Sequence, residues 1–237
     1  WFILGRLFEK GLLYRGHRVL PYCPRCGTVL SSHELSLGYE KVKDRSVYVT
    51  FPLTDGSGRE LVVWTTTPWT LPSNVAAAVH QDMEYVVLTP AAGEFKGRKL
   101  VVAEARAQAL AGLLHLTLAE APATAEVSGP FRGKELVGLR YQRPLEVVPL
   151  PEDRQSRIVI AADFVTSEDG SGIVHMAPAF GADDYAMGQA HDLALVRPVA
   201  PDGTFQGTTW PEIEGKLVTT DETNETIIRR LKADGHW

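Results

Sequence analysis

The fold prediction starts from the stretch Asp169-Gly-Ser-Gly-Ile-Val-His-Met-Ala-Pro-Ala-Phe-Gly-Ala-Asp-Asp-Tyr185. Its first glycines can adopt the backbone angles of a tight turn, and the apolar residues after them predict a short buried strand. A proline then ends the strand, and a helix is expected over about residues 183–193. The pattern therefore gathers His175, Asp183 and Asp184 around one strand-to-helix corner.

Composition alone leaves more than one explanation for these three side chains. Acidic residues are common in the first turn of a helix, where they stabilise its positive end, and this is the simpler explanation of Asp183 and Asp184. His175 is compatible with a hydrogen-bonded core histidine, with a wall of a binding pocket and with a general base.

A second motif, Trp64-Thr-Thr-Thr-Pro-Trp-Thr-Leu-Pro-Ser-Asn74, precedes the first in the chain. Together the two resemble the signatures of the editing domain inserted in the isoleucyl, valyl and leucyl class I aminoacyl-tRNA synthetases. The valyl and leucyl relatives typically have Thr-Thr-Arg-Pro where this chain has Thr65-Thr-Thr-Pro68, and they lack a histidine at position 175. The resemblance, which covers essentially the whole chain, therefore favours the isoleucyl member.

The resemblance implies a hydrolytic function. It implies post-transfer editing, in which mischarged Val-tRNA(Ile) is hydrolysed and Ile-tRNA(Ile) is spared, and it extends to pre-transfer editing of valyl-adenylate. One missing methylene changes binding by only about 1–3 kcal/mol, a limit for which isoleucyl-tRNA synthetase is itself the standard illustration, so a second, smaller site is needed. The implied partners are the 3′ end of tRNA(Ile) carrying valine and the rest of the parent synthetase.

The resemblance also assigns roles within the two motifs. It matches Asp184 to the essential aspartate, whose carboxylate would bind the α-ammonium group of the substrate. With Thr66 and Thr67 this residue forms the predicted catalytic set. The predicted substrate-binding residues are Trp64, Thr65, Trp69, Thr70, Asn74, Gly172, His175, Ala177 and Asp183.

The threonine cluster has two explanations. Threonines are common as ordinary β-branched residues of strands. Alternatively, a cluster interrupted by Pro68 leaves hydroxyl and backbone N–H groups free to bind water, the terminal ribose or a carbonyl oxygen. Strand alternation would place Thr65 and Thr67 on one face and Thr66 on the other. The sequence has no G-x-S-x-G nucleophile motif and no H-E-x-x-H motif, so we expect hydrolysis by bound water without a cofactor.

Overall composition limits the class of protein. The 237 residues are 44% hydrophobic, which is typical of a folded domain, and no apolar run approaches the roughly 20 residues that span a bilayer. The net charge of −5 argues against a broad nucleic-acid groove but allows capture of an RNA end. No signal peptide is visible, and the chain opens in an apolar helix pattern without Met. We expect a piece of a larger cytoplasmic enzyme.

Cys23 and Cys26 form a Cys-x-x-Cys knuckle that can provide two thiolates to one zinc ion. A structural zinc normally has four ligands, so this is half a site, which His17 or His33 could complete locally. The resemblance implies instead a second Cys pair outside this sequence that would share a structural zinc. The alternative is a redox pair, which would require a thioredoxin-like setting.

The remaining pattern predicts an α+β, β-rich fold with three parts. Residues 1–45 would form a stem helix and the knuckle, residues 46–200 a β-barrel editing core, and residues 201–237 a return loop and a second stem helix beside residues 1–14. Helices are expected at 1–14, 103–114 and 221–232. Strands are expected at 47–51, 61–64, 85–88, 100–102, 136–141, 145–149 and 157–164.

Three other functions remain open. The chain could be a non-catalytic zinc- or RNA-binding module of a synthetase, or the editing domain of a valyl-type enzyme. A general esterase or amidase is the third, and the missing nucleophile argues against it. A deacylation assay with Val-tRNA and Ile-tRNA would distinguish these possibilities from isoleucyl-type editing.

Overall fold

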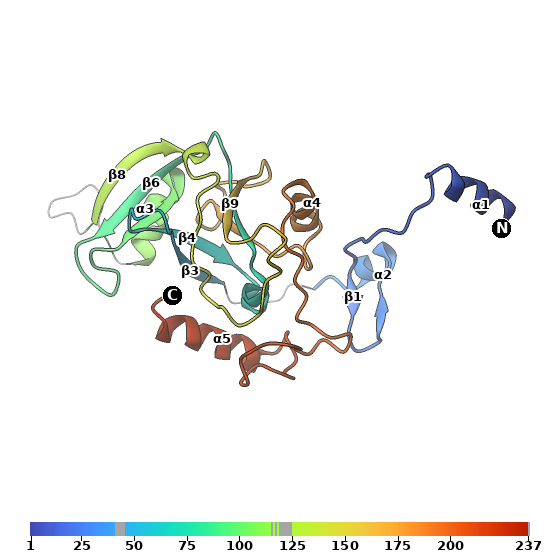
Figure 1. Cartoon of the computed structure of the whole chain (residues 1–237). Helices are drawn as coiled ribbons and strands as arrows, with labels where there is room; N and C mark the ends of the chain where they lie inside the picture. Colours follow the sequence, from blue (N-terminus) through green and yellow to red (C-terminus); the bar gives the residue numbers. More distant parts are fainter. Residues whose placement is uncertain (41–45, 115, 117, 119–124, 237) are drawn as a thin grey trace.

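The computed structural model describes residues 1–40, 46–114, 116, 118 and 125–236. Figure 1 shows a small N-terminal part at one side and a larger β-rich body at the other. The N-terminal part contains helix α1 (Phe2–Glu9), the antiparallel pair β1 (Tyr22–Cys23) and β2 (Thr28–Val29), and helix α2 (Ser32–Leu37). In the described part of the chain α1 buries none of its residues. The predicted boundary between residues 45 and 46 borders residues 41–45, which lie outside the described residues.

The body is built on an eight-stranded sheet. In chain order its strands are β3 (Val47–Pro52), β4 (Arg59–Thr65), β5 (Ala76–Val79), β6 (Glu84–Pro90), β7 (Lys99–Ala103), β8 (Ala125–Arg132), β9 (Ile158–Ala161) and β10 (Ile173–Met176). They lie side by side in the order β8-β6-β7-β4-β10-β5-β9, and β3 pairs with β4 outside this path. Among the described residues the end strands β8 and β9 do not pair with each other, so the sheet is a half-barrel.

Strand β4 is buried on both faces, which explains its nearly continuous apolar sequence. Leu61 and Val63 point into the larger hydrophobic core, whereas Val62 points into a second core on the opposite face. Helix α3 (Glu104–Leu113) covers that second face with Ala107 and Leu110 (Figure 1). The predicted helix at 103–114 is therefore confirmed.

The last helix, α5 (Asp221–Ala233), closes the larger core. Its Ile227 and Leu231, four residues apart on one helix face, are fully buried. The helix contacts the short 3-10 helix η1 (Pro68–Ser73) and lies far from α1 in Figure 1. The prediction that it returns beside residues 1–14 is wrong, because its apolar face is complementary to the body of the domain.

Four predicted strands are confirmed as β3, β4, β6 and β7, and the segment 157–164 contains β9. The segments 136–141 and 145–149 are not regular strands: Arg140 and Tyr141 form only isolated bridges, and residues 145–149 are irregular. Val147 and Val148 are both buried, so successive side chains point inward instead of alternating as in a strand. The 3-10 helix η2 (Gly133–Glu135) precedes this irregular region.

Two strands of the large sheet lie outside the predicted set. Strand β5 consists mainly of alanine, which has low strand propensity, and it is a strand because β10 and β9 pair with its two edges. Strand β8 lies at the end of the sheet and contains Gly129 and Pro130, both unfavourable inside a central strand.

Candidate active site

Parallel pairing of β4 with β10 creates the edge at which the two motifs meet. Val174 of β10 lies opposite Trp64 of β4, so both strands end at the same edge of the sheet. The threonine-rich motif begins in the last two residues of β4, and His175 lies next to the end of β10. Helix α4 (Ala182–Ala190) then begins beyond β10, close to the predicted start.

The threonine hydroxyls form a connected cluster. The N–H group of Thr67 donates to Thr65 Oγ1 at 3.1 Å, and the Thr65 and Thr67 hydroxyls are 3.3 Å apart. The Thr67 hydroxyl is also 3.4 Å from that of Thr70. Thr65 and Thr70 are buried, whereas Thr66 and Thr67 are exposed. Pro68 begins η1 and turns the chain so that Thr70 returns toward the end of β4.

His175 joins the second motif to this cluster. Its Nε2 lies 2.8 Å from Thr70 Oγ1, whose own hydroxyl donates to the Thr67 carbonyl at 2.8 Å. Because a hydroxyl has one proton, this arrangement makes Nε2 the protonated nitrogen, which donates to Thr70. The other nitrogen, Nδ1, is then an acceptor, and it is buried without a partner among the described residues. Burial lowers the pKa of His175 to about 4, so its imidazole is neutral at pH 7.

Asp184 lies in the first turn of α4 and is held against the end of β10. Its Oδ2 accepts a hydrogen bond from the N–H group of Ala177 at 2.9 Å. Burial raises the pKa of this half-buried carboxyl, an effect that the Ala177 hydrogen bond opposes. A Cβ atom at Gly181 would lie 2.9 Å from the Asp184 carboxyl carbon, so glycine allows the close approach. The neighbouring Asp183 is exposed.

Trp69 and Phe180 form a second link between the motifs. Their rings lie edge to face with centroids 5.0 Å apart. Trp69 belongs to η1, and its N–H group donates to Asn224 Oδ1 of α5 at 3.2 Å. Phe180 is not among the predicted site residues, although it lies within the glycine-rich motif between the strand and the helix.

Three predicted substrate-binding residues lie away from this cluster. Trp64 points to the face of β4 opposite Thr65 and packs against Gly170. Asn74 is fully buried, where its side chain donates to the Ala76 carbonyl and accepts from the Tyr141 hydroxyl at 2.6 Å.

Gly172 precedes β10, at the end of the strand remote from His175. Its positive φ of 75° and its approach to Ala103, where an added Cβ would lie 2.4 Å from the methyl carbon, explain the glycine structurally. The sequence places these residues within the two motifs but could not show which face of the sheet each occupies.

The family follows from comparison with known proteins. The family model for class I tRNA synthetases (I, L, M and V) matches residues 1–221. The chain belongs to this family. It is 47% identical over 241 residues to the isoleucine–tRNA ligase of Streptomyces coelicolor, and the alignment covers 98% of this chain and 22% of that protein. The isoleucine–tRNA ligase of Thermoplasma acidophilum is 44% identical over 233 residues, with 98% and 21% coverage. The chain thus spans about a fifth of the length of these relatives.

Solved structures establish the fold of this synthetase chain. The leucyl-tRNA synthetase editing domain of P. knowlesi aligns with a TM-score of 0.58 at 14% identity, covering 82% of this chain and 96% of that domain. The corresponding P. falciparum domain aligns with a TM-score of 0.57 at 10% identity, with 82% and 99% coverage. The predicted β-rich, barrel-like fold is confirmed, whereas these similarities do not show a zinc-knuckle stem.

The two cysteines of the predicted half zinc site lie close together in this synthetase chain. The N–H group of Cys26 donates to Cys23 Sγ at 3.3 Å, and the side-chain contact between the two thiols lowers the pKa of Cys23 and raises that of Cys26. In the described part of the chain, no group of three or more His, Cys, Asp or Glu side chains is placed to hold a metal. His17 instead lines a pocket beside α4, and His33 lies in α2.

That pocket, with a volume of about 400 Å³, is separate from the candidate site. It is lined by Tyr185 and Gln189 of α4 and by Arg154, and neither His175 nor Asp184 contributes to it. We locate the candidate site at the edge where Thr70 and His175 meet, because hydrogen bonds hold the threonine hydroxyl and the imidazole in fixed positions there.

Among the described helices, none is long and apolar enough to cross a membrane.

Proposed function

We propose that this chain is the editing domain of an isoleucyl-tRNA synthetase and that it hydrolyses mischarged Val-tRNA(Ile) while sparing Ile-tRNA(Ile). The observation that carries the proposal is the hydrogen bond between Thr70 and His175, which joins the two motifs at one sheet edge. The relatives named isoleucine–tRNA ligase and the editing-domain fold support it. Valyl-adenylate is the corresponding pre-transfer substrate.

Asp184 would bind the α-ammonium group of the aminoacyl ester. Its carboxylate is half-buried and fixed by Ala177, so it offers an anion in a defined position. A cation bound there would lower the pKa of the Asp184 carboxyl and so oppose the effect of burial, which raises it. Restricting the amino acid in this way fixes its carbonyl group relative to the water that attacks it.

His175 would form a wall of the side-chain pocket. Its imidazole is neutral at pH 7, so it does not repel the α-ammonium group, and Thr70 fixes the ring. A wall in this position leaves room for valine and excludes the additional methylene of isoleucine. A pKa of about 4 makes the ring a weak base, which favours the wall over general-base catalysis.

The threonines would orient the reacting groups. Thr66 and Thr67 are exposed at the end of β4, where their hydroxyls can bind water, the terminal ribose or the carbonyl oxygen. Trp69, which contacts Phe180, would form an apolar side of the pocket together with Ala177. We propose that bound water is the nucleophile and that editing needs no cofactor.

The proposed partners are the 3′ end of tRNA(Ile) carrying valine and the remainder of the synthetase, with the cytoplasm as the location. The net charge of −5 argues against a broad nucleic-acid groove but allows capture of a single-stranded end while other parts of the enzyme hold the tRNA body. Cys23 and Cys26 would share a structural zinc with a second Cys pair outside this sequence, because two thiolates alone do not complete a zinc site.

A deacylation assay tests the function directly. The folded chain, at high concentration, should release valine from Val-tRNA(Ile) and leave Ile-tRNA(Ile) intact, slowly because few tRNA contacts lie in this domain. Asp184→Ala should remove this activity, whereas Asp183→Ala should retain most of it, because the Asp183 side chain is exposed and we assign the ammonium contact to Asp184. Hydrolysis of Thr-tRNA(Val) instead would favour the valyl-type alternative.

A binding experiment gives an independent test of the site. A non-hydrolysable valyl analogue should shift the NMR signals of residues 64–74 and 172–185. Shifts confined to Cys23 and Cys26, with no hydrolysis of any aminoacyl-tRNA by the folded domain, would favour a non-catalytic zinc- or RNA-binding module.

A further inference from the structure

Arg143 is a buried cation outside both motifs. It lies in the irregular segment between η2 and β9, and its side chain is 0% exposed. A buried charge is unfavourable unless hydrogen bonds and an opposite charge compensate for it. The contacts of this guanidinium group therefore indicate why the charge is located there.

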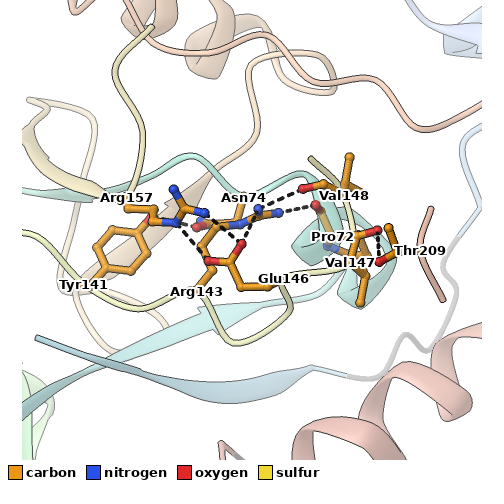
Figure 2. Close-up of polar contacts among 9 residues, drawn as sticks. All are labelled: Pro72, Asn74, Tyr141, Arg143, Glu146, Val147, Val148, Arg157 and Thr209. Carbon is orange, nitrogen blue, oxygen red and sulfur yellow. Dashed lines mark hydrogen bonds and ion pairs between the residues drawn. The ribbon is translucent and has the colours of Figure 1, made fainter. Parts of the chain in front are cut away.

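The guanidinium group holds the end of η1. Its Nη2 donates to the carbonyl of Pro72 at 2.5 Å, and its Nη1 donates to the carbonyl of Val148 at 3.2 Å and to Glu146 Oε2 at 3.1 Å. Pro72 lies in the last turn of η1, where carbonyl groups lack partners within the helix. Figure 2 shows Arg143 between the Pro72 carbonyl and Glu146.

The same segment contacts the chain just after η1. The Tyr141 hydroxyl donates to Asn74 Oδ1 at 2.6 Å, and the Asn74 amide donates to the Ala76 carbonyl (Figure 2 draws Tyr141 and Asn74). Residues 141 and 143 thus bond to residues 74 and 72. The junction between η1 and β5 is fixed from one side by the segment 141–148.

This junction is linked directly to the candidate site. Pro72, which bonds to Arg143, lies two positions after Thr70, which bonds to His175. Both lie in η1, so a displacement of the end of this short helix moves the Thr70 hydroxyl relative to the imidazole. Arg157 also binds Glu146, but it does so from the solvent side, with a side chain that is 43% exposed.

We propose that Arg143 is a positioning residue of the editing site, which, by holding the Pro72 carbonyl, sets the place of Thr70 and thereby the orientation of His175. The proposal rests on the editing function proposed above and extends it to a residue that does not contact the substrate. It makes the valine-over-isoleucine selectivity depend on a hydrogen bond outside the pocket.

The test compares Arg143→Met, Arg143→Lys and the matched control Arg157→Met. Arg143→Met keeps the apolar stem of the side chain and removes the donors, and Arg143→Lys keeps the charge but not the fork geometry. Arg157→Met removes the exposed partner of Glu146 and leaves the bond between Arg143 and the Pro72 carbonyl in place. Thermal unfolding verifies that each variant is folded. NMR then records the amide signals of Thr67 and Thr70 and the imidazole nitrogen signals of His175.

We expect these signals to move in Arg143→Met, to move less in Arg143→Lys and to stay in place in Arg157→Met. For Val-tRNA(Ile), kcat should fall by roughly 10- to 100-fold in Arg143→Met, with KM near the wild-type value. The ratio of valine to isoleucine deacylation should fall by roughly tenfold. A loss of folded protein would leave this ratio unchanged, because both substrates report on the same active molecules.

Unchanged signals and an unchanged ratio in a folded Arg143 variant would overturn the proposal, and so would equal effects of Arg143→Met and Arg157→Met. If Arg143→Met does not fold, Arg143→Lys decides on the same readouts. If the wild-type chain hydrolyses no aminoacyl-tRNA, the editing function fails, while the NMR comparison still decides whether Arg143 positions Thr70 and His175.

Discussion

Burial of His175 predicts a specific pH dependence of stability. The pKa of its imidazole falls from 6.5 to about 4 in the folded protein because the ring is removed from water. In the unfolded chain the ring takes up a proton as the pH falls below about 6.5, whereas the folded protein cannot do so until about pH 4. A depressed pKa therefore gives stability that is present above the unfolded pKa and is lost as the pH falls towards the folded one.

The size of the effect follows from these two pKa values. Relative to pH 7, His175 should reduce the free energy of unfolding by about 2 kcal/mol at pH 5 and by about 3 kcal/mol at pH 4. His175→Gln provides the reference, because glutamine does not titrate and its amide can still bond to Thr70. Subtracting the free energy of unfolding of the variant from that of the wild type at each pH cancels the contribution of the carboxyl groups that titrate in both proteins.

Urea unfolding at a series of pH values measures this difference. The free energy of unfolding of the wild type, minus that of His175→Gln, should decrease continuously from pH 7 to pH 4. A decrease of less than about 1 kcal/mol over this range would show that the imidazole can be protonated in the folded state, and the argument from burial would be refuted. An imidazole NMR signal that titrates near its ordinary pKa would refute the argument equally.

Three further outcomes follow from the site and the fold. Asp184→Ala should abolish deacylation of every substrate, as measured by release of amino acid, because all substrates share the α-ammonium group; equal activity in Asp184→Ala and Asp183→Ala would contradict this. His175→Ala should allow hydrolysis of Ile-tRNA(Ile) while valine release continues, whereas loss of both activities by roughly 10²–10⁴-fold would instead identify a general base. Gly172→Ala should lower the free energy of unfolding by about 1–3 kcal/mol in the same urea experiment, because residue 172 has a positive φ and its new methyl group would meet that of Ala103. Gly138 also has a positive φ but open space around it, so Gly138→Ala should lower the free energy of unfolding by less.

The sequence predicts those parts of the fold that local patterns determine. The short runs of β-branched, apolar and aromatic residues at 47–51 and 61–64 form β3 and β4, because such runs are typical of strands that are mostly buried. Strand β5 could not be predicted from three alanines, because only its neighbours β10 and β9 make it a strand. The segment 145–149 is predicted as a strand because valines favour strands, yet both valines are buried and the Val148 carbonyl group bonds to the buried Arg143.

The same distinction applies to the candidate site. Motif resemblance indicates that residues near Thr70, His175 and Asp184 come together, and the structure places them at one sheet edge, although their roles remain predictions. Resemblance could not separate residues that face this edge from Asn74, which bonds inside the core. Phe180 and Arg143 could not be assigned from the sequence, because their contacts are with residues distant in the chain.

The position of β10 has a consequence for how the domain is made. β10 lies between β4 and β5, which follow each other closely in the sequence, so the central gap of the sheet is filled by a strand synthesised much later. The hydrogen bond between Thr70 and His175 joins residues 105 positions apart, and such distant contacts form late in folding. While a ribosome is still adding the residues before β10, β5 has an unpaired edge and the threonines have no imidazole partner. The same strand thus joins β4 to β5 and brings His175 to Thr70, so the sheet becomes continuous and the candidate site is assembled in one event.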